Sequence, residues 1–173
     1  MEHHLCHAAS AYYGLAKNID DKYLIFTLDG GGDNLRSTVS IGEGGSIERV
    51  SSGNEYSIGN IYSAITHHLG FRSHEHEYKL MGLAPYVNPE YATKYKEFFE
   101  QFLYLKNEDT EFANPEFINH SLFFSKVIRE LGGSRFDNIA AGLQAFTEDI
   151  VIRWIKGNIR KHGIKKVLCA GGV

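Results

Sequence analysis

Three features of the sequence predict an α/β fold with a mixed sheet. Strand-like segments rich in β-branched and aromatic residues come early in the chain, and helical periodicity dominates its middle. A long helical segment then leads into a short apolar strand, the pattern of an α/β crossover. Glycines follow both the first and the last strand, where ligands gather in open α/β sheets. At 173 residues, the chain is long enough to form one hydrophobic core.

The composition is that of a soluble globular protein, with 43% hydrophobic and 23% charged residues. A net charge of −3 without a lysine or arginine block argues against a nucleic-acid partner or an anionic membrane surface. No apolar run approaches the roughly 20 residues of a membrane span, and the first residues lack the features of a signal peptide. Cys6 and Cys169 are too few for a disulfide framework, so we expect a reducing, cytoplasmic location.

Residues 3–15 are expected to form a helix whose histidines are candidate metal ligands. His3 and His7 lie four positions apart, so a helix places them one above the other on the same face. Neutral imidazole nitrogens in that arrangement can converge on a single ion. The alternative is that the first histidines simply lie at a solvated, frayed terminus.

A three-stranded meander is expected over residues 22–53. Its strands are predicted at 23–28, 35–41 and 46–50. The first of them ends in three glycines and the second in Gly42-Glu-Gly-Gly45, which favours tight turns at both connections.

The turn after the first strand is the most informative segment of the chain. Gly30, Gly31 and Gly32 allow a tight turn and a close approach of a ligand to the backbone. Asp29 and Asp33 bracket these glycines with hard oxygen ligands, suited to a metal or to a water held against a phosphate. A plain hairpin and a ligand-binding loop both fit this pattern.

Residues 57–133 are predicted to form a helical layer. Its first helix is indicated by an apolar stripe with Ser57 as N-cap and Gly70 as the C-terminal stop. The polar residues of 71–86 that follow precede a short helix ended by Pro85. Glu77 or Lys79 could position an anionic substrate there, and a polar loop without function is the alternative.

The second part of this layer is predicted to be an aromatic helix over 89–105, an acidic loop over 107–111 and an amphipathic segment over 117–131. The aromatic residues at helical spacing form a packing face rather than a stacking platform for bases. They are Tyr91, Tyr95, Phe98 and Phe102.

A long helix over 137–161 and a strand over 165–170 are expected to close the chain. The helix carries one apolar stripe and ends at Gly163. The residues of the stripe are Ile139, Leu143, Phe146, Ile150 and Trp154. Gly171 and Gly172 follow the strand at its C-terminal end, where a further loop and element would be expected.

Four segments together resemble one family, the O-carbamoyltransferases of the nodulation-protein and antibiotic-tailoring type. They are HHLCHAASA at 3–11, LDGGGD at 28–33, EYKLMGLAPY at 77–86 and CAGGV at 169–173. The order and spacing of these segments match the family over essentially the whole chain. Each segment is a weak signal alone, and their combination is specific.

The resemblance implies a fold of the actin/Hsp70/sugar-kinase (ribonuclease H-like) superfamily, akin to the tRNA threonylcarbamoyl-transferase proteins. The chain would then be a half-domain with a helical insertion, a fragment of a larger carbamoyltransferase domain. The implied parts are a metal-binding helix of the first half at 1–16, the meander of the second half at 22–53, the insertion at 57–133, and a helix and strand of the second half at 137–173.

The activity implied by the resemblance is transfer of a carbamoyl group from carbamoyl-adenylate to a hydroxyl of a small-molecule or saccharide acceptor. A separate C-terminal domain of the family makes the adenylate from carbamoyl phosphate and ATP. A divalent metal, usually iron, is held by the histidine pair, which maps onto His3 and His7, with Asp29 as the matching acid. A further aspartate ligand of the family lies beyond the last glycines.

The same resemblance implies a nucleotide phosphate near both glycine segments, with Lys79 adding a positive charge. The implied phosphate-side residues are Gly30, Gly31, Gly32, Asp33, Gly171 and Gly172. Without its missing parts, the fragment is expected to be inactive on its own. The sequence identifies neither a general base nor the acceptor.

Two other interpretations remain open. An ATPase or sugar-kinase-like domain of the same superfamily would share the glycine turns but would not need His3 and His7. A non-catalytic remnant would instead oligomerise through exposed apolar surface.

Overall fold

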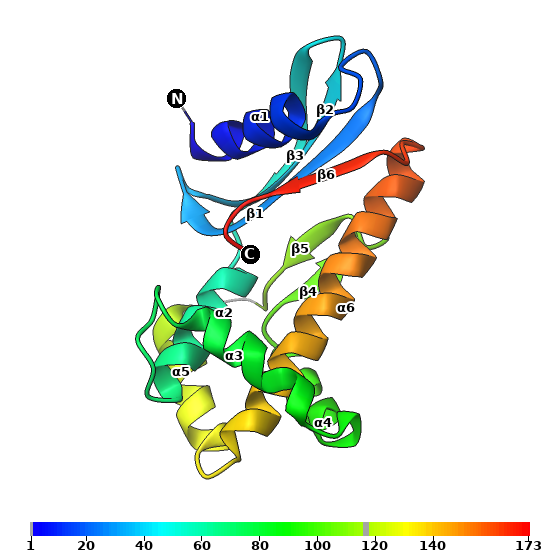
Figure 1. Ribbon diagram of the computed structural model, residues 1–173. Coiled ribbons are helices and arrows are strands. Elements are labelled where there is room, and N and C mark those ends of the chain that lie inside the picture. The colour runs from blue at the N-terminus through cyan, green and yellow to red at the C-terminus, as the bar shows by residue number, and fades with distance from the viewer. Residues whose placement is uncertain (1, 116–117) are drawn as a thin grey trace.

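The computed structural model describes residues 2–115 and 118–173 and confirms an α/β fold with a mixed sheet (Figure 1). Helix α1 covers one face of the sheet, and a layer of helices covers the other (Figure 1). The elements are α1 (His3–Leu15), β1 (Tyr23–Gly32), β2 (Leu35–Glu43), β3 (Ser46–Gly53), α2 (Ile58–His68), α3 (Glu77–Leu83), the 3₁₀ turn η1 (Ala84–Tyr86), α4 (Pro89–Glu100), β4 (Tyr104–Lys106), β5 (Glu111–Ala113), α5 (His120–Leu131), α6 (Phe136–His162) and β6 (Val167–Ala170). None of the described helices has the length and apolar character needed to cross a membrane.

The main sheet has the strand order β3-β2-β1-β6. The predicted meander is confirmed, since β1, β2 and β3 pair antiparallel in sequence order. Strand β6 pairs parallel with β1, from Leu24 opposite Val167 to Thr27 opposite Ala170. Parallel pairing brings the C-terminal ends of β1 and β6 to the same edge of the sheet, as the crossover pattern predicts.

Strand β1 is buried on both faces because it lies in the middle of the sheet between two packed layers. Its even-numbered apolar residues, Leu24, Phe26 and Leu28, belong to the core shared with the helical layer. Tyr23 and Ile25 point the other way and pack against α1. Successive side chains of a strand alternate between faces, so Thr27 and Asp29 also lie on the α1 side.

The reversal between β1 and β2 lies later than predicted. Asp33 and Asn34 form the turn, with φ angles of 49° and 61°, and Gly32 already pairs with Leu35. A two-residue hairpin turn of this kind needs two left-handed residues, and Asp and Asn tolerate that conformation. The three glycines therefore form the irregular end of β1, with a register shift between Leu28 and Gly32.

The helical layer confirms most of the predicted helices. Ser57 caps α2 in a capping box with Asn60, and Gly70 follows the helix with a φ of 79°. All five residues of the predicted α6 stripe are buried. In α4, Phe99 is completely buried, whereas Tyr91 of the predicted packing face is 61% exposed.

The region predicted as the end of a helix and an acidic loop instead contains a small hairpin. Helix α4 ends at Glu100, and β4 and β5 pair antiparallel between Tyr104 and Ala113. Each strand has only three residues, which is too short for a recognisable alternation of polar and apolar side chains. Helix α5 begins at His120, and the Phe117 start predicted for this segment lies outside the described residues.

Candidate metal and ligand site

Helix α1 places His3 and His7 beside the C-terminal end of β1. Its buried stripe against the sheet is made of small or aromatic residues, with His4 at its start. The stripe consists of His4, Ala8, Ala11 and Tyr12. His3 and His7 each precede a stripe residue by one position, about 100° around the helix, so they flank the packed face. Both side chains therefore reach past the helix toward Asp29.

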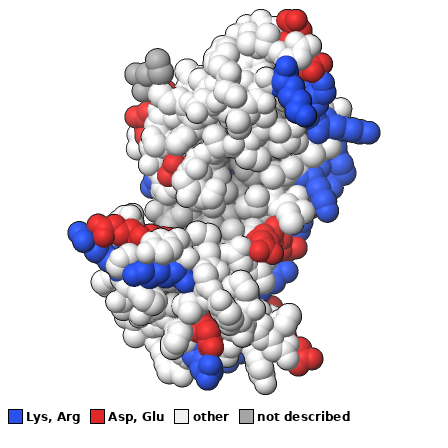
Figure 2. Space-filling model, in the orientation of Figure 1, with Lys and Arg blue, Asp and Glu red and all other residues white. Residues whose placement is uncertain are grey.

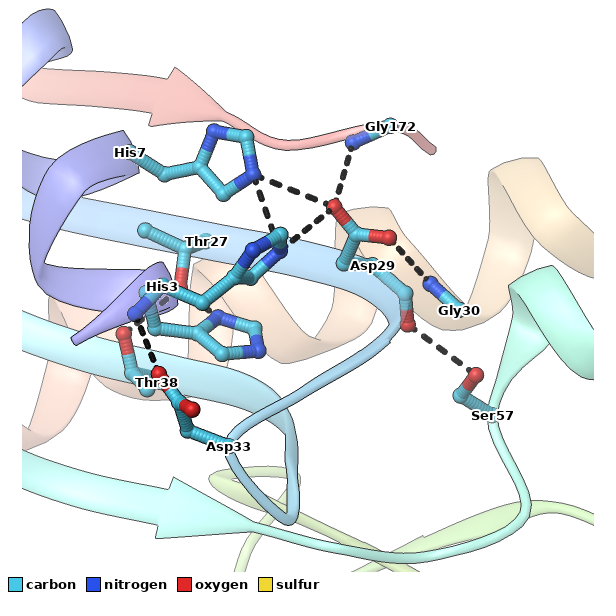
Figure 3. A network of polar contacts seen from close by, with 10 residues as sticks. His3, His7, Thr27, Asp29, Gly30, Asp33, Thr38, Ser57 and Gly172 are labelled. Atoms are coloured by element: carbon cyan, nitrogen blue, oxygen red, sulfur yellow. Dashed lines mark hydrogen bonds and ion pairs between the residues drawn. The ribbon is translucent and has the colours of Figure 1, made fainter.

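The three predicted metal ligands converge in the structure (Figure 3). The Nε2 atoms of His3 and His7 lie 3.2 Å and 3.1 Å from Oδ2 of Asp29. The two Nε2 atoms are 3.2 Å apart. Three donor atoms thus form a nearly equilateral triangle, and all three side chains are partly exposed on its open side.

This triangle fits a divalent transition metal. With bond lengths of about 2.1 Å, neighbouring ligand atoms are about 3.0 Å apart in octahedral and about 3.4 Å apart in tetrahedral coordination. The measured separations of 3.1–3.2 Å lie in that range. Two histidines and one carboxylate on one face, with open positions, form a donor set typical of Fe(II).

Backbone groups hold the Asp29 carboxylate in place. The N–H of Gly30 donates to Oδ1 at 2.6 Å, and the N–H of Gly172 donates to Oδ2 at 3.2 Å (Figure 3). Burial alone would raise the pKa of Asp29, but the hydrogen bonds from His3 and these backbone groups bring its pKa below the usual value. The carboxylate is therefore ionised and oriented before any ligand arrives.

Gly171 allows the chain after β6 to pass close to β1. Its φ is 126°, and a Cβ at this position would lie 2.0 Å from the carbonyl oxygen of Leu28. Only glycine fits such an approach without a shift of the backbone. This close passage brings the N–H of Gly172 within reach of Asp29.

A cleft of about 680 Å³ opens next to the triangle, between the end of β1 and the helical layer. Its lining residues come from the end of β1, from the segment after β6, from the α2–α3 region and from α6. They are Asp29, Gly30, Gly31, Gly59, Asn60, Tyr62, Ser63, His74, Glu77, Met81, Gln144, Thr147, Gly172 and Val173. Among these described residues, Asp29 and Glu77 are the charged ones and both are acids. The inside of the hollow is mostly white in Figure 2, and charged side chains of both signs lie along its rim.

The predicted phosphate-side residues divide into two groups. Gly30, Gly31 and Gly172 line the cleft, whereas Gly171 is not among its lining residues. Gly32 instead lies under the His3 ring, where a Cβ would come within 2.3 Å of an imidazole carbon. Asp33 accepts a hydrogen bond from the His3 backbone N–H at 2.7 Å, so it caps the first turn of α1 and does not line the cleft.

Of the two charged candidates in the 71–86 segment, one lies at the cleft and the other does not. Glu77 lines the cleft, and its carboxylate accepts a hydrogen bond from the His74 backbone N–H at 2.6 Å. Lys79 lies outside the cleft, with its ammonium 5.6 Å from the centre of the Phe71 ring. Because both groups are on one short helix, they point to different sides, and the structure does not bring Lys79 to the site.

The helical wall of the cleft contains residues that were not predicted as site residues, namely Gly59, Asn60, Tyr62 and Gln144, and it is held against β1 by the predicted N-cap Ser57. The Ser57 hydroxyl donates to the Asp29 carbonyl at 3.1 Å and so fixes the start of α2 against β1. Gly59 permits the contact, since a Cβ there would lie 2.7 Å from Cα of Gly30. Within the same helical wall, the Tyr62 hydroxyl on α2 donates to the Gln144 side-chain oxygen on α6 at 2.7 Å. The sequence contained one signal for this contact: Gly59 lies in the first turn of a helix with a predicted N-cap, where a glycine can mark a close approach of another backbone.

A family model described as the carbamoyltransferase N-terminus matches residues 1–173. The nodulation protein NolO of Bradyrhizobium diazoefficiens is 32% identical over 177 residues, covering 100% of this chain and 31% of the relative. The nodulation protein NolNO of Sinorhizobium fredii is also 32% identical over 177 residues, covering 100% of this chain and 25% of the relative.

A more distant relative is the uncharacterized protein MJ1058 of Methanocaldococcus jannaschii, 30% identical over 190 residues, with 99% of this chain and 30% of the relative covered. The chain thus spans about a third or less of the length of these relatives. Since the family model covers every residue, the match is not confined to one motif. The chain belongs to the carbamoyltransferase family and corresponds to its N-terminal region.

Proposed function

We propose that this chain is the metal-bearing part of an O-carbamoyltransferase that uses carbamoyl-adenylate as donor and a hydroxyl of a small molecule or saccharide as acceptor. The observation that carries the proposal is the convergence of His3, His7 and Asp29 at the edge of the cleft. Membership of the carbamoyltransferase family supplies the reaction class. The metal site supplies a reason for that cleft to bind an activated carbamoyl group.

His3, His7 and Asp29 would hold the divalent ion, with iron as the expected metal. A bound ion would supply Lewis-acid polarisation of a carbamoyl oxygen and positive charge for a phosphate. The chain's own contribution is orientation: Gly30 and Gly172 use their N–H groups to aim the Asp29 carboxylate. The two N–H groups therefore orient a metal ligand directly, and they would act on the nucleotide only indirectly, through the metal that Asp29 helps to hold.

The phosphate of the adenylate is proposed to lie between the metal ligands and the first turn of α2. Gly59 and Asn60 of that turn line the cleft, and the N-terminus of a helix favours negative charge. The described lining residues include no Lys or Arg to neutralise a phosphate. Anion binding in this cleft should therefore depend on the bound metal.

The remaining polar wall would face the nucleoside and the acceptor. Burial raises the pKa of Tyr62 to about 12, so its hydroxyl stays protonated and remains a hydrogen-bond donor. That hydroxyl and Gln144 already contact each other, which orders this part of the wall. Neutral hydrogen-bonding groups of this kind suit hydroxyl-bearing ligands.

The fold is proposed to be half of an actin-like domain. The sheet order β3-β2-β1-β6, with three antiparallel strands and a parallel fourth, supports this assignment. The relatives are about three to four times as long as this chain, and an adenylate-forming domain is the proposed partner in the remaining length. By this proposal the isolated chain binds metal but does not transfer carbamoyl groups.

Metal titration of the purified chain tests the proposal. Wild-type protein should bind one equivalent of Co²⁺ or Fe²⁺, and His7→Ala should weaken that affinity by at least about 10- to 100-fold. His120→Ala is the matched control, because His120 lies at the start of α5, contacts the Tyr56 hydroxyl and is not one of the three converging ligands. AMP, a stable mimic of the adenylate, should bind the metal-loaded protein and not the metal-free protein.

An ATPase or kinase-like domain is the alternative that this experiment separates. Such a domain would not need the histidine pair, so metal and AMP binding would be the same in wild type and His7→Ala. That outcome would contradict the proposed metal site. Carbamoyl transfer to a hydroxyl acceptor by the isolated chain would contradict the proposed need for a partner domain.

A further inference from the structure

His4 is a fully buried histidine between the two candidate metal ligands in sequence. Its Nδ1 lies 2.7 Å from the Thr27 hydroxyl, which in turn lies 2.6 Å from the Thr38 hydroxyl. These three side chains form one polar chain from α1 through β1 to β2, and all three residues are at most 1% exposed. Thr27 and Thr38 also face each other directly across the β1–β2 ladder (Figure 3).

This polar chain lies on the same face of β1 as the metal ligands. Thr27 precedes Asp29 by two residues, so both side chains point toward α1. His4 follows His3 by one residue, and its ring centre lies 5.3 Å from that of His3 and 6.3 Å from that of His7. Two neighbouring contacts thus join α1 to β1, one between His4 and Thr27 and one between the ligand histidines and Asp29.

The apolar contacts of α1 do little to set its position on the sheet. The stripe behind His4 contains Ala8 and Ala11, whose small side chains present a smooth surface. Tyr12 is the one large anchor of this stripe, and it lies two turns away from His4. Besides the Asp33 cap on the His3 N–H and the contacts of the candidate ligands with Asp29, the His4–Thr27 contact is the directional interaction that can fix the rotation and height of this part of the helix.

Burying a histidine at this position costs free energy of folding, so its presence indicates that its hydrogen bond is needed. Nε2 of His4 has no hydrogen-bond partner among the described residues. An apolar residue would fill the same space without an unpartnered nitrogen, so packing alone does not account for the imidazole.

We propose that His4 is a positioning residue which, through Thr27 and Thr38, holds α1 in the one orientation that directs His3 and His7 at Asp29. The inference rests on the metal site of the proposed function and concerns how that site is built. A helix rotated or shifted by a fraction of a turn would still pack its alanines on the sheet. It would no longer bring two Nε2 atoms within 3.2 Å of each other and of the carboxylate.

Thr27→Val tests the proposal because it replaces the hydroxyl by a methyl group of nearly the same size. The probe is Co²⁺, read by its affinity and by its visible absorption, which reports the number and arrangement of its ligands. We expect a 10- to 100-fold loss of affinity and a changed spectrum, the size of effect typical of groups that orient metal ligands. Thr27→Ser keeps the hydroxyl and should restore both readouts.

Thr66→Val is the matched control. Thr66 is also fully buried, lies in α2 on the opposite face of the sheet, and has a hydroxyl without a hydrogen-bond partner among the described residues. This variant should leave the affinity and the spectrum unchanged. Circular dichroism and thermal unfolding of each variant show that the comparison is made on folded protein.

Each outcome bears on the proposal. Wild-type affinity and spectrum in Thr27→Val would overturn it, while leaving the proposed metal site intact. Equal losses in Thr27→Val and Thr66→Val would also overturn it, because the effect would then follow core stability. Absence of Co²⁺ binding in wild type would contradict the metal site itself. If Thr27→Val does not fold, Thr38→Val removes the far end of the same chain and is expected to show a smaller loss in the same direction.

Discussion

The two faces of the central sheet are built differently. On the helical face, large aliphatic and aromatic residues from five helices and three strands form one extended core. On the α1 face, the buried apolar set is small and comes from α1, β1 and β6, namely Ala8, Ala11, Tyr12, Tyr23, Ile25 and Leu168. Buried His4, Thr27 and Thr38 lie on this second face, next to the candidate metal ligands.

Because of this difference, one face of the sheet supplies most of the stability of the fold and the other sets the position of the candidate metal ligands. Non-directional apolar burial supplies most of the free energy of folding, and the helical face has far more of it. Directional hydrogen bonds decide how α1 sits, because alanines alone leave the helix free to shift. Strand β1 belongs to both faces and ends in Asp29, so the stable core fixes one ligand and the polar face fixes the other two.

The comparison predicts its largest effect for a substitution in the helical face. Phe99→Ala removes a completely buried ring and should lower the free energy of unfolding by about 3–5 kcal/mol. Tyr91→Ala, on the same helix but exposed, should change it by less than about 0.5 kcal/mol. Urea unfolding measures both values. Equal effects of the two variants would show that this core does not carry the stability assigned to it.

A second prediction concerns the passage of the chain beside β1. Gly171→Ala places a methyl group against the Leu28 carbonyl, so it should destabilise the protein by about 1–3 kcal/mol and weaken metal binding as Gly172 moves away from Asp29. Gly44→Ala is the control, since Gly44 also has positive φ but has open space around its Cβ. It should cost about 1 kcal/mol and leave metal binding unchanged. Unchanged metal affinity in Gly171→Ala would remove Gly172 from the account of how Asp29 is held.

A smaller effect is expected at Asp33, which caps α1. Asp33→Gly permits the left-handed turn but removes the acceptor for the His3 N–H, so unfolding should become easier by about 1 kcal/mol. Asp33→Asn keeps an acceptor and tolerates the same φ, so its stability should stay close to that of wild type. Thermal unfolding of the two variants measures the difference. If Asp33→Asn has wild-type stability but binds AMP more weakly than wild type, a role of Asp33 at the phosphate would be favoured instead.

Much of the fold follows from local patterns in the sequence. The α1 bounds, the three strands, the Ser57 cap and the α6 stripe all depend on residues close together in the chain. The convergence of His3, His7 and Asp29 could also be predicted from the sequence. The i, i+4 spacing of the two histidines and the resemblance to a family in which an acid at the position of Asp29 is a ligand both indicate this site.

The features that the sequence could not reveal depend on contacts between distant segments. The β4–β5 hairpin is stabilised by long-range contacts such as the Asn114 side chain with Phe102 and Tyr56, which leave no periodic pattern. The wall of the cleft combines residues from α2, α3 and α6. Lys79 lies on α3 but points away from the cleft, toward the Phe71 ring. The way α3 packs decides which of its side chains face the cleft, and the sequence does not show that packing.

The central claim is that His3, His7 and Asp29 form one metal site, and anomalous X-ray scattering tests it most directly. Crystals of the chain soaked with Co²⁺ or Fe²⁺ should show one strong anomalous peak about 2.0–2.2 Å from Nε2 of both histidines and from Oδ2 of Asp29. A peak at other histidines, or full metal loading without density at these three atoms, would contradict the claim.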